Sequence, residues 1–208
     1  MPKVKIARKS TAIDMTAMCD VAFLLLTFFI LTATARQPEP LPVDTPASTV
    51  EALQPDAGIG TVTIGGTGKV FFGVKDIPVR IKMLEAMSAI YKIPFTEEEK
   101  KRFSLMESFG VPIGNLKQLI NMDNAARNKE GLQPGIPADS VGGNVSELHN
   151  WILKARYATK EVTEQDMRVS IKGDSKEEYP AIKKVIDIIQ AQKLNKFSLI
   201  TSLRAAEK

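Results

Sequence analysis

The sequence MTAMCDVAFLLLTFFILTATA, residues 15–35, decides the architecture of this chain. About 20 apolar residues at 1.5 Å rise per residue are enough for a helix to cross a bilayer. The stretch holds a single charged residue, Asp20. A carboxylate in hydrocarbon costs roughly 2.5–3.5 kcal/mol on insertion scales, and such groups usually face a partner or a water-filled path. The sequence therefore predicts a membrane helix whose carboxylate has a function.

Three threonines share one face of this predicted helix with Asp20. At about 100° per residue, four polar side chains project within an arc of roughly 40°: Thr16, Asp20, Thr27 and Thr34. The seven-residue steps from Asp20 to Thr27 and on to Thr34 keep side chains along a helix–helix seam. The alternative is structural, with each threonine bonding its own preceding-turn carbonyl and Asp20 lying close to the headgroups. We favour a polar stripe that serves the carboxylate.

The flanks of residues 15–35 predict orientation. Residues 33–35 resemble a small-residue cleavage site, so a signal peptide is an alternative to a retained anchor. The acidic residue early in the apolar run and the spanning length favour the anchor. Four basic residues precede the span and only Arg36 follows it closely: Lys3, Lys5, Arg8 and Lys9. The positive-inside rule then places residues 1–14 in the cytoplasm and exports the rest.

Composition excludes several functional classes. The chain has 208 residues and a net charge of +4, with part of the basic excess in the N-terminal arm, so nucleic acid is not an expected partner. Cys19, the only cysteine, lies in the predicted span, which leaves no disulfide for the exported part. His149 is the only histidine, which argues against a histidine-rich metal site. We predict no metal and no cofactor, and we find no nucleophile–base constellation typical of an enzyme.

Residues 36–58 contain five prolines among small and acidic residues and predict a semi-extended linker. At about 3.1 Å per residue, some 20 residues reach on the order of 60 Å. Such a segment is either a tether through which a membrane motor acts at a distance or a passive spacer.

Residues 59–208 predict a small α+β domain with helices packed on a mixed β-sheet. Residues 61–64 and 69–72 flank a glycine-rich turn and predict a hairpin. The C-terminal part predicts, in order, a helix over 147–160 with Ser146 as N-cap, a strand over 167–172, a helix over 179–193 and a strand over 196–201. A strand–helix–strand order favours parallel pairing. Trp151 is expected in the core.

Residues 77–144 form a long middle region. Residues 79–92 are amphipathic, Thr96 and Glu99 predict a capping box before a charged helix, and Gly110 is a candidate terminator of that helix. Residues 112–126 predict one more helical segment, and residues 129–143 predict a loop. The charged run 97–102 is either a solvated helix face or a docking surface.

Several motifs resemble the ExbD/TolR family of biopolymer transport proteins. The segment IDMTAMCDV (13–21) followed by FLLLTFFILTAT (23–34) resembles the family's membrane anchor, with Ala17 where the family has proline. VSIKGD (169–174), YPAIKKVIDIIQAQKL (179–194) and KFSLIT (196–201) resemble its last strand, helix and strand. The middle region departs from the family pattern and resembles an insertion.

The resemblance implies an inner-membrane energy transducer that couples the proton-motive force to TonB-dependent transport across the outer membrane. Asp20 would be the proton-binding carboxylate, and Thr27 would hydrogen-bond it or its water. The implied partners are an ExbB-like multi-span ring subunit, a TonB-like periplasm-spanning protein and a second copy in a dimer. Asp14 would cap the helix or contact the ring, and capping is the favoured role.

Three alternatives stay open. A TolR-like subunit would maintain envelope integrity. A membrane-anchored periplasmic scaffold would use Asp20 only to hold helices together. A flagellar-type stator also has a membrane aspartate, but no pattern of a peptidoglycan-binding domain follows the linker.

Overall fold

The computed structural model describes residues 15–33, 39–48, 57–66, 68–129, 131–140, 145–194 and 197–203. The chain divides into two compact units, Met1–Gln37 and Pro38–Lys208. The first unit contains helix α1 (Met15–Thr32), and the second contains a folded α+β domain. The predicted fold class is therefore confirmed.

The domain is built on a four-stranded mixed sheet with the order β3-β2-β4-β5. The strands are β2 (Ile59–Gly65), β3 (Lys69–Val74), β4 (Arg168–Gly173) and β5 (Phe197–Ile200). Strands β2 and β3 form the predicted antiparallel hairpin, and the turn uses positive φ angles at Gly66 and Gly68. Strand β4 pairs in parallel with both β2 and β5, which confirms the predicted parallel pairing.

Alternation along the strands gives the sheet two distinct faces. The helix face consists of buried apolar side chains: Val62, Ile64, Val70, Phe72, Val169 and Ile171. The open face carries the intervening residues of the same strands: Thr61, Thr63, Phe71, Gly73, Ser170 and Lys172. The period-2 pattern thus directs the apolar set toward the helices.

Helices α2 (Ile77–Tyr91), α6 (Glu147–Thr163) and α7 (Tyr179–Ala191) pack against the helix face. Helix α6 begins where the sequence predicts, because the Ser146 hydroxyl accepts a hydrogen bond from the His149 N–H. Trp151 is fully buried, as expected. Its indole N–H donates to the Glu147 carboxylate, which also accepts from the Ile113 N–H and so ties α6 to the start of α4 (Ile113–Asn121).

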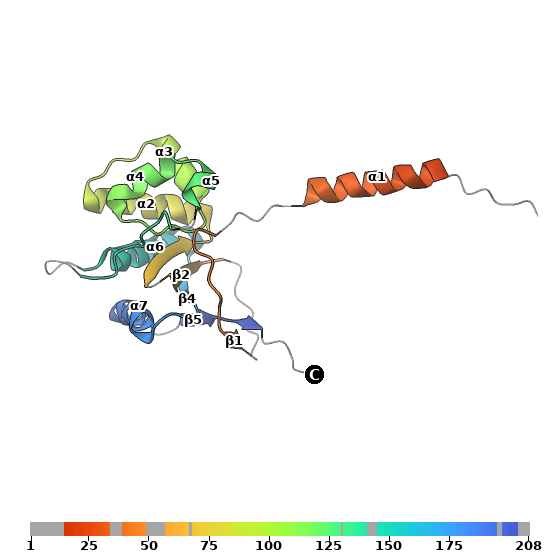
Figure 1. The fold of residues 1–208 in the computed structure, drawn as a ribbon. Coiled ribbons are helices and arrows are strands. Elements are labelled where there is room, and N and C mark those ends of the chain that lie inside the picture. Colours follow the sequence, from red (N-terminus) through yellow and green to blue (C-terminus); the bar gives the residue numbers. More distant parts are fainter. Residues whose placement is uncertain are drawn as a thin grey trace, which may run out of the picture. The chain divides into compact units, whose positions relative to one another are not determined.

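The middle region belongs to the same hydrophobic core. Its helices α3 (Glu97–Ser104), α4 and α5 (Asn124–Arg127) gather with α2 beside α6 (Figure 1). Phe103 stacks on Trp151 with ring centroids 6.3 Å apart, and Phe109 meets the indole edge to face at 4.7 Å. A region that supplies aromatic rings to the central tryptophan is part of the domain's folding unit.

The same region also covers the outer edge of β3. Phe72 and Phe109 exchange two backbone hydrogen bonds of 2.9 and 3.0 Å, and the Ile136 N–H donates to the Val70 carbonyl at 2.8 Å. An unpaired strand edge invites association with other chains. The middle region therefore satisfies backbone groups of β3 that a bare hairpin would leave open.

Two local predictions in this region are wrong. Gly110 does not terminate α3, which ends at Ser104 with Leu105 as its C-cap. Gly110 instead lies against the ring of Phe71, where an added Cβ would come within 2.4 Å of ring carbons. Residues 112–126 do not form one helical segment either, because Met122 is extended (φ −75°, ψ 153°) and separates α4 from α5.

The predicted capping box at the start of α3 is confirmed. The Thr96 hydroxyl accepts from the Glu99 N–H, and the Glu99 carboxylate accepts from the Thr96 N–H at 2.8 Å. Asn121 also donates to this carboxylate, and Lys117 lies 3.6 Å from it. The Thr96 backbone hydrogen bond is the main reason why the pKa of Glu99 lies below its usual value.

Glu99→Gln is expected to make the stability of the domain depend less on pH in the acidic range. A lowered folded-state pKa gives stability that is complete above the unfolded value of about 4.3 and is lost as the pH falls through the folded value. The variant should be less stable than wild type at pH 6 and should lose less stability on acidification below about pH 4.3. Urea denaturation at several pH values measures this, with the exposed Glu98→Gln on the same helix as control. Parallel pH curves for Glu99→Gln and wild type would contradict the assignment.

Candidate functional site

Helix α1 is the one helix of the described residues that is long and apolar enough to cross a membrane. It covers Met15–Thr32 of the predicted span, and residue 33 follows it without helical structure. Its large apolar side chains are exposed within their own unit, and Phe28 and Phe29 meet edge to face with ring centroids 6.1 Å apart. An apolar helix surface of this kind suits lipid or another apolar helix.

Asp20 lies on the exposed surface of α1, in its second turn, and is the only charged residue of the helix. Thr27 follows on the same face, two turns later, and its hydroxyl donates to the Leu24 carbonyl at 2.9 Å. Seven residues of helix rise span about 10.5 Å, so Thr27 is too far away to bond Asp20 directly within one helix. The hydroxyl retains acceptor lone pairs, through which it can reach Asp20 by way of water or a neighbouring helix.

The rest of the predicted stripe is only partly described. Thr16 shares the face of Asp20 in α1, whereas Asp14 and Thr34 lie outside the described residues. Thr32, which was not part of the predicted stripe, also donates its hydroxyl to a preceding-turn carbonyl, that of Phe28, at 2.7 Å. The Thr27 hydroxyl thus donates its hydrogen to a carbonyl of its own helix, as the structural alternative expects. That the polar stripe serves Asp20 stays a prediction.

The second feature of interest lies on the open face of the sheet. We call residues 39–44 the strap; they fall within the predicted linker, yet they lie in the same compact unit as the domain. The Lys172 ammonium is 2.5 Å from the Glu39 carboxylate, and the Ser175 N–H donates to the Asp44 carbonyl at 2.8 Å. Just beyond the strap, β1 (Ala47–Ser48) pairs in parallel with β6 (Ser202–Leu203).

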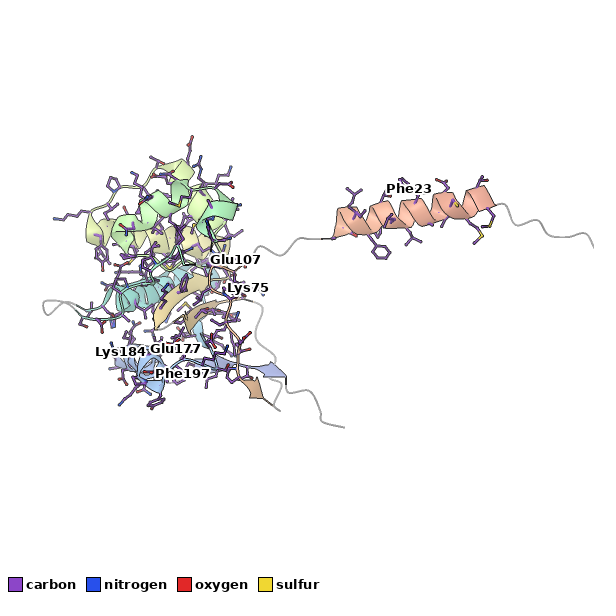
Figure 2. All side chains as sticks on the ribbon, in the orientation of Figure 1. Phe23, Lys75, Glu107, Glu177, Lys184 and Phe197 are labelled. Carbon is purple, nitrogen blue, oxygen red and sulfur yellow. The ribbon has the colours of Figure 1, made fainter. Side chains whose placement is uncertain are left out.

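A cavity of about 520 Å³ lies between the strap and the sheet. Thr61, Thr63 and Gly73 line it from the open face, and Glu39 and Leu41 line it from the strap. Its far wall includes Lys75 and Glu107, which Figure 2 shows at the same end of the domain. The strap therefore covers the open face without filling it.

Arg80 fixes the wall of this cavity. Its guanidinium is buried and donates to the carbonyls of Val74, Lys75 and Ser104, which joins α2 to the end of β3 and the end of α3. Burial lowers the pKa of Arg80, and the carboxylates of Glu107 and Asp76 act in the opposite direction. A cation bound by three backbone carbonyls is a structural clamp, not a free ligand.

A wider groove of about 1050 Å³ lies between the loop of residues 134–139 and the start of α7. Glu177 and Lys184 lie on its α7 side (Figure 2), and the Lys184 ammonium is 2.9 Å from the Asp139 carboxylate. Both partners of this ion pair are largely exposed, so the pair contributes little stability. No group of three or more His, Cys, Asp or Glu side chains suited to a metal ion occurs in the described part of the chain.

Sequence reasoning identified Asp20 but missed the strap. The ion pair joins positions 133 residues apart, so no local pattern identifies Glu39 and Lys172 as partners. The available signal was the alternation of Glu39, Leu41 and Val43 between prolines, which is the pattern of an extended segment with one face in contact.

A family model described as biopolymer transport protein ExbD/TolR matches residues 7–204. The chain belongs to the ExbD/TolR family. The match covers α1 and nearly all of the α+β domain, and the family consists of transport proteins. No curated protein and no solved structure matches the chain.

Proposed function

We propose that this ExbD/TolR family member is the subunit of an inner-membrane energy transducer in which Asp20 takes up and releases protons. Proton movement through Asp20 then drives TonB-dependent transport across the outer membrane. The observation that carries the proposal is the position of Asp20 as the only charged residue of α1. Membership in a transport family and the length and apolar character of α1 support it.

The chemistry follows from the environment that a membrane helix provides. An apolar surrounding disfavours a charged carboxylate, whereas water or a cationic partner favours it. A carboxylate that moves between two such surroundings binds a proton in one and releases it in the other. Thr27, about two helical turns away, offers an acceptor for a water molecule that carries the proton onward.

The proposed assembly supplies those two surroundings. We propose an ExbB-like multi-span ring subunit around α1, a second copy of this chain in a dimer, and a TonB-like periplasm-spanning protein as the recipient of the mechanical work. The N-terminal arm is cytoplasmic and the α+β domain is periplasmic in this arrangement. Asp14, beside the start of α1, caps the helix or contacts the ring.

A second candidate is a TolR-like subunit that maintains envelope integrity, because the matching family description names ExbD and TolR together. The proton chemistry of Asp20 is the same in both cases, and the periplasmic partner is TolA-like in the second. A scaffold in which Asp20 only pairs helices is the alternative without proton transfer.

Infrared titration of the full chain, reconstituted in membranes with its ring subunit, tests the proton-binding role. Aspartate labelled with ¹³C shifts the carboxyl bands, and subtraction of an Asp20→Asn spectrum isolates the band of Asp20. We expect the protonated band of Asp20 to decline as the pH rises through the working range. A band of constant intensity over that range would exclude proton uptake and release by Asp20 and would favour the scaffold.

A further inference from the structure

The strap is attached to the domain by an ion pair, a backbone hydrogen bond and apolar side-chain contacts. At one end Glu39 pairs with Lys172 on the open face, and at the other end Asp44 accepts a hydrogen bond from Ser175. Between them the side chains of Leu41 and Val43 contact the end of β2. The attachment therefore combines a charge pair with a shape fit.

The shape fit depends on the absence of a side chain at Gly65. A Cβ at this position would lie 2.6 Å from Cγ1 of Val43 and 3.4 Å from Cδ2 of Leu41. Gly65 pairs with Lys69 and has no positive φ, so the backbone itself does not require glycine here. The close approach of the strap is the remaining reason for glycine at this position.

The attachment is also weak enough to be reversible. The side chain of Glu39 is 54% exposed and that of Lys172 is 19% exposed, so water screens one partner of the pair and its contribution to stability is modest. The cavity beneath the strap removes packing contacts that a filled interface would have. Segments with few buried contacts open locally while the core of a domain stays folded.

The strap lies in the covalent path from α1 to the domain. With the strap attached, the connection from Ala33 to Glu39 is six residues long and reaches at most about 20 Å. With the strap released, the first attachment is β1 at Ala47, and the fourteen residues reach at most about 46 Å. Attachment of the strap thus halves the distance that the domain can move from the end of α1.

We propose that the strap is a reversible latch, in which the Glu39–Lys172 pair and the Val43–Gly65 contact hold residues 39–44 on the open face and limit the reach of the domain. This inference concerns the connection between the two units and goes beyond the proton chemistry of Asp20. It holds or fails whether or not Asp20 binds protons.

Hydrogen–deuterium exchange of the full chain in lipid nanodiscs tests the latch. The reporters are the peptides that cover residues 39–48 and 174–178, because the Ser175 amide donates to the strap. Glu39→Lys and Lys172→Glu should each speed exchange of both peptides by about fivefold. The double variant Glu39→Lys/Lys172→Glu should restore slow exchange. Single variants equal to wild type, or a double variant that exchanges as fast as the singles, would overturn the charge contact.

A second variant pair tests the shape fit without any change of charge. Gly65→Ala should speed exchange of the same peptides, and adding Val43→Ala should slow it again because the new methyl group then has room. Gly114→Ala is the matched control, since nothing lies within 4 Å of a Cβ there. Peptides from β4 must stay protected in every variant, which separates latch release from unfolding. Failure of both rescue pairs would overturn the latch.

The distance that the domain can move from the end of α1 is measured separately, by electron-spin distance measurements between labels at residues 33 and 199 in a Cys19→Ser background. The distribution of distances between the two labels should extend to longer distances in Glu39→Lys. It should return to the wild-type distribution in Glu39→Lys/Lys172→Glu. Faster strap exchange with an unchanged distribution would show that the strap does not limit reach. Asp20→Asn should leave exchange and distances as in wild type, so a failed latch and a failed proton site give different results.

Discussion

Asp20→Asn is expected to lower proton-driven transport by about 100-fold or more while the protein still inserts and assembles. Asparagine keeps the size and polarity of the side chain, but its amide does not titrate at physiological pH and so cannot alternate between a neutral and a charged form. If protonation of Asp20 is the coupling event, the loss is nearly complete. The measurement is uptake of an outer-membrane substrate in cells, with and without a dissipated proton gradient.

Two further variants make that result specific. Asp20→Glu keeps a carboxyl group and should retain part of the activity. Thr27→Val removes the hydroxyl but keeps the shape, and it should lower the rate only if Thr27 serves the carboxylate through water. Normal uptake and normal envelope integrity in Asp20→Asn would favour the scaffold, whereas normal uptake with loss of envelope integrity would favour the TolR-like subunit.

Much of the architecture could be predicted because its signals are local. The apolar run of α1 has a length fixed by the bilayer, the Ser146 cap lies within three residues of its donor, and the hairpin of β2 and β3 joins neighbouring strands. The order of strand, helix and strand near the C-terminus was enough to predict the parallel pair β4–β5. Asp20 is a candidate for the same reason, since a charge in an apolar run is visible without any tertiary information, and its role stays a prediction.

The features that sequence reasoning missed are contacts between distant segments. The strap pairs residue 39 with residue 172, and the edge of β3 is covered through Phe109 and Ile136. Local periodicity does not identify the distant partner of such a contact, because each contact uses only one or two residues. Gly110 shows the limit clearly: a glycine after a helical pattern predicts a C-cap, yet here it makes room for Phe71.

Contacts between distant segments also change the interpretation of the middle region. From the sequence it resembles an insertion, either a docking surface or a passive elaboration. In the structure Phe103, Phe109, Leu116 and Ile120 are core residues, so deletion of this region would remove part of the core. Point substitutions at its contacts with α6 are therefore the informative experiment.

Trp151→Ala is expected to lower the free energy of unfolding of the domain by about 3–5 kcal/mol. The indole is fully buried, lies 4.7 Å from the Phe109 ring centroid and donates to Glu147. Truncation leaves a cavity and removes a donor from the half-buried Glu147 carboxylate. Because Trp151 is the only tryptophan, urea denaturation should be followed by circular dichroism. Tyr157→Ala, on the exposed side of the same helix, should cost about 1 kcal/mol or less.

A double-mutant cycle then decides whether the middle region and α6 share one core. Phe109→Ala should also destabilise the domain by about 3–5 kcal/mol. The two substitutions remove partners of one edge-to-face contact, so the double variant should be less destabilised than the sum by about 0.5–1.5 kcal/mol. Strict additivity would mean that the two rings do not interact, and a small effect of Phe109→Ala alone would mean that the middle region is a passive elaboration. A coupling of this size would show that the part of the middle region that carries Phe109 packs on α6 in the folded domain, so that the two share one hydrophobic core.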